Sequence, residues 1–357
     1  MKPFFNPMSR RSFLKGTGGA AIAMSFLPTD GWSQDKQVNV FNWDTYIGET
    51  TLETFTASTG IKVQYDLFGD NEEMFAKLEK GNPGYDIIVP TDYMVYDMVQ
   101  LGMLETLDHS KIPNMKNLDS SFTNPAYDPG LKHAIPYMWG TMGFGYRKSK
   151  VKSAPASWEA VFKNTDPALA NRISLLSDMR AVIGGALKYL GYSMNSVNPD
   201  EIAKARDLII AAKKDIKSFA EDNGQDLLAS GEVDIALEWS GDIAAVMLED
   251  DDIDYVVPKE GSNVWVDNLC IPKGGPNIEN AYAFINYLHD VDVHVEIANT
   301  IYFATPNAPA KAKMPAEYTD NPAVFAPADV LSRCEPILSV GDDTRLYSDA
   351  WTAIQAA

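Results

Sequence analysis

After the amino-terminal segment, two patterns of hydrophobic residues alternate along the chain, one typical of strands and one typical of helices. Short, nearly continuous apolar runs are typical of buried parallel strands. The predicted strands lie at residues 38–42, 61–68 and 86–89. Between them, apolar positions three or four residues apart predict helices. These helices lie at residues 51–58, 72–80 and 92–100. Asn71 is the expected N-cap of the second helix, and Gly60 and Gly81 are suited to end the first two. This alternation predicts a doubly wound α/β region.

A similar alternation continues in a second region, from about residue 143 to residue 266, and beyond it. The predicted strands lie at residues 173–176, 233–237 and 265–271. The predicted helices lie at residues 182–190, 199–213, 241–248 and 279–288. A proline-rich stretch then runs from residue 305 to residue 336. Two α/β lobes, with the chain crossing between them more than once, fit this pattern.

Three of the predicted strands lead into the same layout, an apolar run followed by an aromatic residue and a carboxylate. The segments read VNVFNWDTY (38–46), YDIIVPTDY (85–93) and VDIALEWSGD (233–242). Ligands of open α/β sheets bind at the carboxyl ends of the strands. A site of Trp, Tyr and Asp with few Lys or Arg suits an organic cation, because aromatic faces attract ammonium groups and carboxylates pair with them.

Composition and charge exclude several classes of function. The 357 residues suffice for two domains with full cores, and the formal net charge is −19. A chain this acidic is a poor candidate for binding nucleic acid or an anionic membrane, because both select basic surfaces. The acidity is explained by solubility and does not by itself identify a cationic ligand. With four His and no CxxC or HExxH motif, we expect neither a metal nor a cofactor.

The amino terminus has the pattern of an export signal. Residues 9–15 read SRRSFLK, and a weakly apolar stretch, GTGGAAIAMSFLP, follows at residues 16–28. The paired Arg10 and Arg11 resemble a twin-arginine signal, and the apolar stretch is too short to be an ordinary membrane span. We expect residues 1–34 to be removed, near Ser33 or Gln34, and the mature protein to reside in the periplasm. No other segment has the pattern of a membrane span.

The two cysteines, Cys270 and Cys334, could pair in an oxidising compartment. However, they are far apart in the sequence, and Cys270 lies in the apolar run LCIP. Two buried free thiols are therefore the simpler interpretation.

Seven stretches, in this order, carry a resemblance to a known family. They read VFNWDTYIGETTLETFTASTGIKVQYDLF, NEEMFAKLEKGNPGYDIIVPTDYMV, IPYMWGTMGFGYRKSKV, SWEAVF, LEWSGDIA, VPKEGSNVWVDNLCIPKGGPNIENAYAFINYL and IYFATPN. Together they resemble the periplasmic spermidine/putrescine-binding proteins of ABC transporters over nearly the whole mature chain. The run NPAVFAPADV, followed by Trp351, is closer to the putrescine-preferring branch.

The resemblance implies an α/β fold of the periplasmic-binding-protein type, with two lobes, a hinge between them and the ligand in the cleft. Each lobe is expected to be a doubly wound mixed sheet. The first lobe would comprise residues 37–141 and 267–315, and the second lobe residues 142–266 and 316–357.

The resemblance also implies the ligand contacts, which are aromatic, hydroxyl or acidic residues at the strand ends. The matching positions are Trp43, Asp44, Tyr46, Thr91, Asp92, Tyr93, Asp178, Trp239, Asp242, Trp265, Asp267 and Phe303. Trp265 and Asp267 match the pair that grips an amine in the family. Asp44, Asp178 or Asp242 would hold a second ammonium group, directly or through water.

Three departures from the family bear on the ligand. Phe303 stands where members have a Tyr, and residues 179–182 lack the second acid that usually follows the position of Asp178. Ile337 stands where spermidine binding uses a Gln. These losses weaken the case for spermidine more than that for putrescine.

Structural interpretations remain open for several of these residues. Strand-end Trp residues often belong to the core. Asp92 is equally suited to cap the helix that follows it, and Asp178 could pair with Arg180.

The function implied is binding without catalysis, by a monomer that delivers a polyamine to ABC transporter permease subunits after hinge closure. One alternative is another organic cation or an amino-acid-like solute, such as agmatine, which would need fewer carboxylates. A secreted hydrolase using paired Asp residues is a second alternative, but no G-x-S-x-G or metal motif supports it. An anion or ferric-ion site is a third, although anion sites use helix N-termini and Arg.

Overall fold

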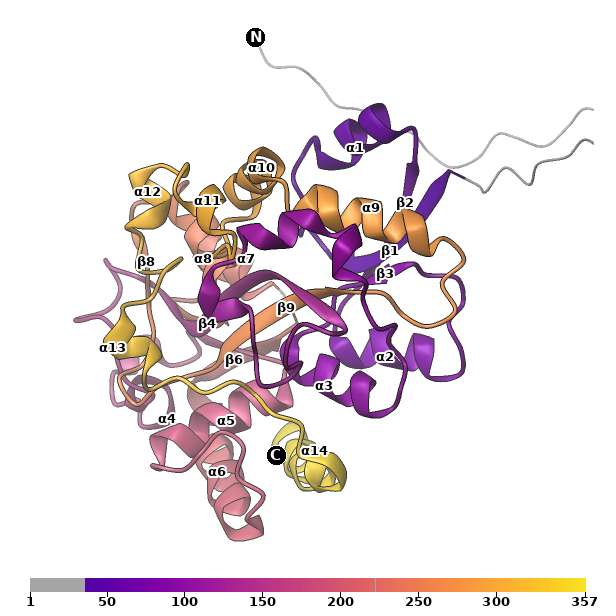
Figure 1. Ribbon diagram of the computed structural model, residues 1–357. Coiled ribbons are helices and arrows are strands. Elements are labelled where there is room, and N and C mark those ends of the chain that lie inside the picture. Colours follow the sequence, from indigo (N-terminus) through magenta and orange to yellow (C-terminus); the bar gives the residue numbers. More distant parts are fainter. Residues whose placement is uncertain (1–35, 222) are drawn as a thin grey trace, which may run out of the picture. The chain divides into compact units, whose positions relative to one another are not determined.

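The computed structural model describes residues 36–221 and 223–357, and the predicted signal peptide lies outside them. Strands and helices alternate along the chain (Figure 1). The strands are β1 (Gln37–Trp43), β2 (Lys62–Phe68), β3 (Ile87–Ile88), β4 (Ala134–Arg147), β5 (Ile173–Leu176), β6 (Ile216–Ala220), β7 (Ile235–Trp239), β8 (Ile253–Val256) and β9 (Val264–Cys270). In the described chain, no helix is both long and apolar enough to cross a membrane.

The helices divide into two sets along the sequence. Those before β7 are α1 (Thr51–Thr59), α2 (Asn71–Glu79), α3 (Asp92–Gln100), α4 (Glu159–Phe162), α5 (Met179–Tyr189), α6 (Pro199–Ala212) and α7 (Gly224–Ala229). Those after β7 are α8 (Ser240–Met247), α9 (Ile278–Leu288), α10 (Val291–Ile301), α11 (Ala308–Lys311), α12 (Ala316–Thr319), α13 (Ala328–Leu331) and α14 (Thr344–Ala356).

One long strand, β4, joins two groups of strands. Its residues from Ala134 to Thr141 pair antiparallel with β9, and those from Met142 to Arg147 pair with β7 and β8. The strand order is β2-β1-β3-β9-β4-β7-β5-β6, with β8 also on β4. β1 is parallel to β2 and β3, and β5 is parallel to β6 and β7. Both groups are therefore mixed, as predicted, while the lobe boundaries stay a prediction.

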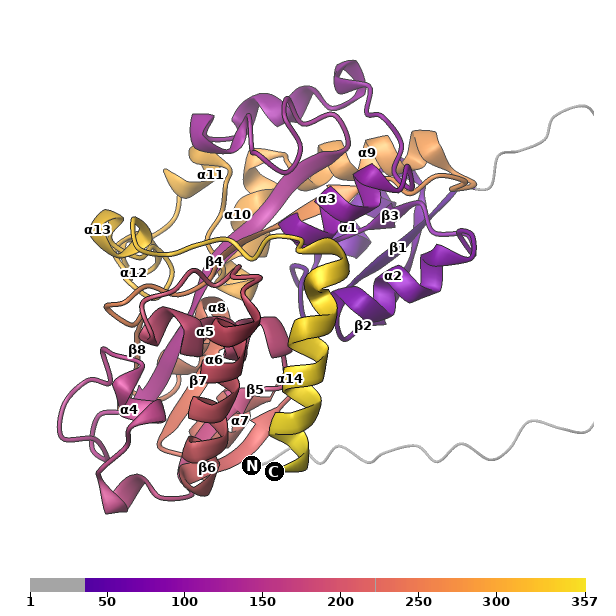
Figure 2. The ribbon, with the colours of Figure 1, turned by 90° about the horizontal axis from the view of Figure 1, so that it is seen from below.

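Alternating side chains of β1 enter two different cores. Val38 and Val40 pack in a cluster that includes residues of α9 and α10, whereas Phe41 packs with residues of α2 and α3. This is the two-residue period of a strand that is covered on both faces. A third cluster gathers residues of β5, α5, α6 and α14. Figure 2 shows α5, α6 and α14 together, with α2 and α3 among the indigo and purple elements.

Local sequence signals predicted several helix ends correctly. One predicted N-cap was wrong. The helix predicted at residues 92–100 has these bounds, and Gly60 ends α1 with φ 73°, a conformation that favours glycine. The N-cap of α2 is Asp70, whose carboxylate accepts the N–H of Glu73 at 2.6 Å. The prediction that Asn71 caps this helix is wrong, because Asn71 is already helical and its side chain binds Thr91 instead.

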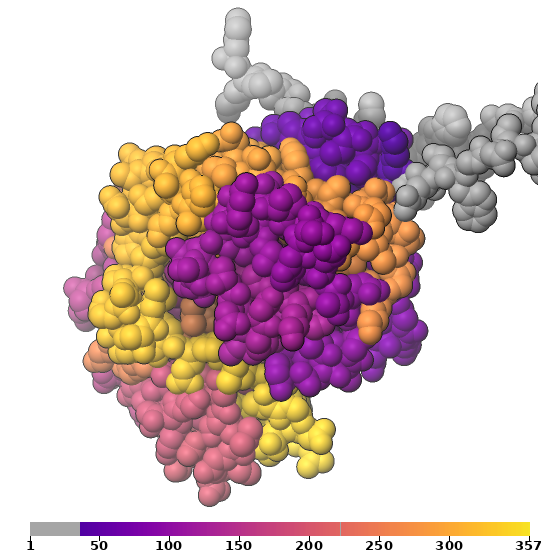
Figure 3. All heavy atoms as spheres, viewed as in Figure 1, coloured from indigo at the N-terminus to yellow at the C-terminus, as the bar shows by residue number. Residues whose placement is uncertain are grey.

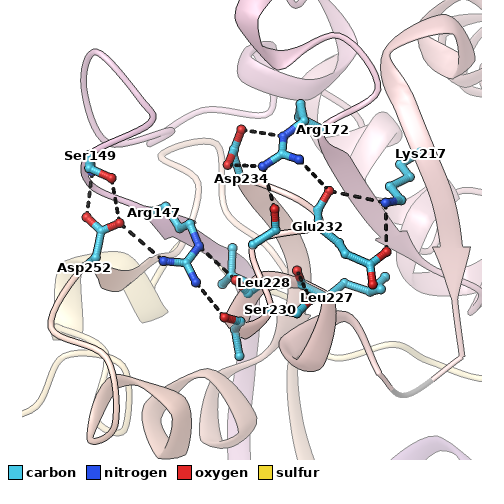
Figure 4. Close-up of polar contacts among 12 residues, drawn as sticks. Arg147, Ser149, Arg172, Lys217, Leu227, Leu228, Ser230, Glu232, Asp234 and Asp252 are labelled. Carbon is cyan, nitrogen blue, oxygen red and sulfur yellow. Dashed lines mark hydrogen bonds and ion pairs between the residues drawn. The ribbon is translucent and has the colours of Figure 1, made fainter.

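The strand predicted at residues 233–237 begins two residues later, at Ile235. A polar network occupies the residues before it (Figure 4). Arg172 donates two hydrogen bonds to the Asp234 carboxylate, at 2.8 and 2.7 Å, and two to the carbonyls of residues 231 and 232. Arg147, at the end of β4, donates to the carbonyls of Leu228 and Ala229. These contacts fix the turn between α7 and β7 as a loop.

The sequence pattern gave no prediction for β4, because prolines and glycines interrupt it. The glycines are required by close packing across the strand. A Cβ atom at Gly140 would lie 2.7 Å from the Trp265 ring, and one at Gly143 would lie 2.7 Å from Tyr255. Cys270 and Cys334 are both free thiols, as the simpler interpretation predicted, but only Cys270 is buried, whereas Cys334 is partly exposed.

Candidate functional site

Asp267 is the most informative of the predicted site residues. β9 carries it into the protein interior, where only 6% of its surface is exposed. Its carboxylate accepts hydrogen bonds from the Tyr46 hydroxyl at 2.9 Å and the Thr91 hydroxyl at 2.7 Å. Burial raises the pKa of Asp267 to about 7, against the lowering effect of these two hydrogen bonds. In the described chain, no Lys or Arg forms an ion pair with it. A buried carboxylate of this kind is suited to a cationic ligand.

A row of aromatic rings adjoins this carboxylate. The Tyr46 ring meets the edge of Phe303, with centroids 5.4 Å apart, and Phe303 meets Trp265 at 5.2 Å. Trp265 in turn meets Trp239 at 6.0 Å, almost at a right angle. Phe303 lies against Gly241, where an added Cβ atom would collide with its ring. The row therefore joins residues from four segments that are far apart in the sequence.

Asp242 and Asp92 both lie near this group. The charge of Asp242 is among the influences that raise the pKa of Tyr46, after burial and Asp267. Asp92 is only 4% exposed, and burial raises its pKa to about 8, with the charge of Asp267 adding to the effect. The capping interpretation of Asp92 is wrong, because the N-cap of α3 is Thr91. Asp92 accepts the N–H of its neighbour Tyr93 at 2.7 Å.

Tyr93 and Asp178 belong to a second acidic group. The Tyr93 hydroxyl donates to the carboxylate of Glu72 at 3.1 Å. Burial raises the pKa of Glu72, and the charge of Asp178 raises it further. Asp178 is the N-cap of α5 and accepts the N–H of Ala181 at 2.9 Å. Sequence reasoning missed Glu72, because an acidic residue in the first turn of a helix is ordinarily explained by the helix dipole.

The interpretation of Asp178 as an ion-pair partner of Arg180 is wrong. Their charges interact, but no ion pair joins these two described side chains. The Arg180 guanidinium donates to Asn195 and to the carbonyl of Leu338, both at 3.1 Å, and lies over the Tyr347 ring at 4.3 Å. Arg180 is thus held by the packing around α14.

Trp43 and Asp44 have contacts of a different kind. The Trp43 indole donates to the carbonyl of Val89 at 2.9 Å, and its ring packs on Phe68. Asp44 is exposed, and its carboxylate accepts the N–H of Thr45 at 2.8 Å. Trp43 is thus attached to the residue that follows β3, and Asp44 to its own turn; none of these contacts involves Asp267.

A hollow of about 560 Å³ lies elsewhere, and none of the predicted site residues lines it. Its walls include Phe122, Trp139, Lys311 and Phe325. The Lys311 ammonium lies 3.6 Å from the centre of the Phe325 ring. Figure 3 shows the purple segment near residue 120 beside the orange and gold segment near residue 310. A wall that already carries a cation does not suit a cationic ligand, so the aromatic row beside Asp267 remains the candidate site.

Comparisons with known proteins concern the chain as a whole rather than the single residues of this site. Residues 50–326 match a family described as bacterial extracellular solute-binding protein, and residues 7–26 match the signal sequence of the twin-arginine translocation pathway. The chain is 35% identical over 341 residues to the putrescine-binding periplasmic protein SpuD of Pseudomonas aeruginosa, covering 91% of this chain and 93% of the relative. It is 34% identical over 323 residues to spermidine/putrescine-binding periplasmic protein 1 of Haemophilus influenzae, covering 90% and 89%.

Solved structures give the same result for the fold. A putative spermidine/putrescine ABC transporter protein from Listeria monocytogenes superposes with a TM-score of 0.85 and 34% identity, covering 90% of this chain and 99% of that one. The predicted periplasmic-binding-protein fold is therefore confirmed, and so are the twin-arginine signal and the periplasmic location.

Proposed function

This chain belongs to the family of bacterial extracellular solute-binding proteins, and we propose that its ligand is a short polyamine, putrescine first among them. The observation that carries the proposal is the buried carboxylate of Asp267, which has two hydroxyl donors and lies beside a row of aromatic rings. In this proposal, an ammonium group of the ligand pairs with Asp267.

The aromatic row explains how the rest of a polyamine would bind. Methylene groups pack well on the rings of Trp265 and Trp239, and their faces also attract an ammonium group. A second ammonium group requires a second carboxylate, because an unpaired charge is costly to bury. Asp44, Asp178 and Asp242 are the predicted candidates; Asp44 and Asp178 are exposed, and Asp242 is partly buried.

In this proposal, binding of the polyamine is the first step of its import into the cell. In this proposal the protein acts as a monomer, and its lobes close over the ligand by a hinge motion. The closed form docks on the permease subunits of an ABC transporter and releases the polyamine there. The family consists of binding proteins, which agrees with the expectation that the chain is not an enzyme.

An amino-acid-like ligand is less well supported than a polyamine. Such a ligand carries a carboxylate, which would need a cationic partner in the site. Arg180 is the charged group nearest in sequence to Asp178, and its guanidinium is engaged by Asn195, Leu338 and Tyr347. Agmatine has no carboxylate, so this argument does not separate it from putrescine.

A ligand panel measured by thermal shift tests the proposal, since a ligand that binds only the native state raises the melting temperature. The panel contains putrescine, spermidine, agmatine and γ-aminobutyrate, with Asp267→Asn as the control variant. We expect putrescine to raise the melting temperature of the wild-type protein most, and to raise that of the control much less. A shift with γ-aminobutyrate alone would contradict the proposal.

A further inference from the structure

We propose that Glu72 is a specificity-determining residue that binds the second ammonium group of the ligand together with Asp178. This inference rests on the proposed function and deepens it, because it makes the ligand a dication with a carboxylate contact at each end. None of the sequence patterns or family matches assigned a role to Glu72. Four structural observations support a role for Glu72 in ligand binding.

The first observation is that the start of α2 is attached to the loop that holds Asp267. The Asn71 side chain donates to the Thr91 hydroxyl at 3.0 Å and accepts the Thr91 N–H at 3.0 Å. The same Thr91 hydroxyl donates to Asp267 at 2.7 Å. Asp70, which precedes Asn71, caps the helix by accepting the N–H of Glu73, the residue after Glu72. The backbone of Glu72 is therefore fixed relative to the predicted anchor of the ligand.

The second observation concerns the segment from Thr91 to Tyr93. The Thr91 hydroxyl donates to Asp267, and the Tyr93 hydroxyl donates to Glu72 at 3.1 Å. One short segment thus contacts two carboxylates, one through each of two nearby side chains. A diamine that lies along this segment would have a carboxylate for each of its ammonium groups.

The third observation is that the charge of Asp178, which belongs to the other group of strands, acts on Glu72. Asp178 follows β5, which pairs with β6 and β7, whereas α2 follows β2. The charge of Asp178 raises the pKa of both Glu72 and Tyr93. The negative charge of Asp178 thus disfavours the charged form of Glu72. Figure 2 shows α2 and α5 in the two separate groups of elements.

The fourth observation is the surroundings of these carboxylates. Both Glu72 and Asp178 are accessible to solvent, and yet the protein around them raises the pKa of each. Both side chains can therefore be reached by a ligand from the solvent. In the part of the chain that the structure describes, neither forms an ion pair with Lys or Arg.

These observations give the second ammonium group a physical role. Two carboxylates whose charges interact without a counter-ion repel, and a cation bound by both converts this repulsion into two attractions. Because Glu72 and Asp178 belong to different groups of strands, a cation bound by both would also favour the closed arrangement. Glu72 would thereby replace the acidic residue that the family usually has shortly after the position of Asp178, where this chain has the buried Ala181 and Val182.

Titration calorimetry with putrescine tests the role of Glu72. The variant Glu72→Gln removes the charge and keeps an oxygen that accepts from Tyr93. The matched control is Glu79→Gln, an exposed position at the end of the same helix that changes the net charge equally. We expect Glu72→Gln to weaken putrescine binding at least tenfold and Glu79→Gln to change it less than twofold. Equal affinities for Glu72→Gln and the wild-type protein would overturn the inference.

The double variant Glu72→Gln/Asp178→Asn tests whether the two carboxylates share one ammonium group. Residues that act on the same group show non-additive effects. We therefore expect the double variant to lose less affinity than the product of the two single losses. Fully multiplicative losses would show that the two carboxylates act separately, against the inference. If the wild-type protein binds no polyamine, the proposed function fails as well, whereas normal wild-type binding with an unaffected Glu72→Gln variant removes only this inference.

Discussion

The Tyr46 hydroxyl donates a 2.9 Å hydrogen bond to Asp267, although 221 residues separate the two in the chain. Tyr46 follows β1 and Asp267 lies in β9, so the contact connects two segments that the fold brings together. The Tyr46 ring is enclosed by Tyr137 and Phe303, and burial raises its pKa well above the usual value. The phenol therefore stays protonated and remains a donor. Asp267 is thus oriented before any ligand arrives, which reduces the free-energy cost of ordering the site on binding.

Asp267→Asn is expected to lower the affinity for the ligand by about 2–4 kcal/mol, the range for breaking a desolvated charge pair. Tyr46→Phe keeps the ring and removes only one hydrogen bond, so it is expected to cost about 0.5–1.5 kcal/mol. Titration calorimetry on both variants measures the two losses. A loss of less than twofold in affinity for Asp267→Asn would refute the role of Asp267 as the anchor.

Ligand affinity is expected to rise with pH between about 6 and 8. In the free protein the pKa of Asp267 is about 7, so a large share of this carboxyl is protonated at pH 6. An ammonium group pairs with the carboxylate form, so binding must release that proton at low pH and needs no release well above pH 7. Asp92, with a pKa of about 8, extends the range upward. Calorimetry at several pH values, in buffers of different ionisation enthalpy, measures the protons released. An affinity that is constant from pH 6 to 8 would contradict this linkage.

The parts of the fold that local sequence signals determine were predicted well. A glycine after α1 and an amphipathic run in α3 are local features, and both helices lie where they were expected. β4 was missed because Gly140 and Gly143 resemble breaks in the sequence. Their function is to let Trp265 and Tyr255 approach the strand, which only the tertiary structure shows.

Some residues of the candidate site were predicted from the sequence and others were not, again because some contacts depend on the tertiary structure. Tyr46, Thr91 and Asp267 were identified by their resemblance to family positions, and the structure brings them into contact. No pattern distinguished Glu72 from any other acidic residue at a helix start. Its relation to Tyr93 and Asp178 depends on long-range packing between two groups of strands.

Arg172→Met is expected to lower the free energy of unfolding by about 2–3 kcal/mol. The change leaves the carboxylate of Asp234, which is almost fully buried, and two backbone carbonyls without their charged donor. Arg206→Met is the matched control, since the ion pair that Arg206 forms in the described chain is with the largely exposed Asp207. The control should change stability by less than about 0.5 kcal/mol. Urea unfolding of both variants gives the comparison, and equal effects would show that the network around Arg172 adds no special stability.

Replacing Arg10 and Arg11 together by Lys is expected to keep the precursor in the cytoplasm. Residues 7–26 match the twin-arginine signal sequence, and the apolar stretch after the arginines is weak. Cell fractionation in a host with this pathway, followed by immunoblotting, measures the distribution. A single Arg11→Lys variant controls for the effect of one arginine alone. Normal periplasmic delivery of the double variant would mean that the general secretory route suffices.

Putrescine is expected to bind at least tenfold more tightly than spermidine. Ala181, Phe303 and Ile337 occupy positions where the family has polar groups, and all three are buried here. Phe303 is packed between Tyr46 and Trp265, so an apolar ring takes the place of a hydroxyl. The third nitrogen of spermidine would then lack a partner, and an unpaired buried polar group costs about 1–3 kcal/mol, with a charge costing more. Direct titration of both amines measures the ratio, and Phe303→Tyr, which restores the hydroxyl, should narrow it. Equal or tighter binding of spermidine would mean that Asp44, Asp92 or Asp242 serves the third nitrogen.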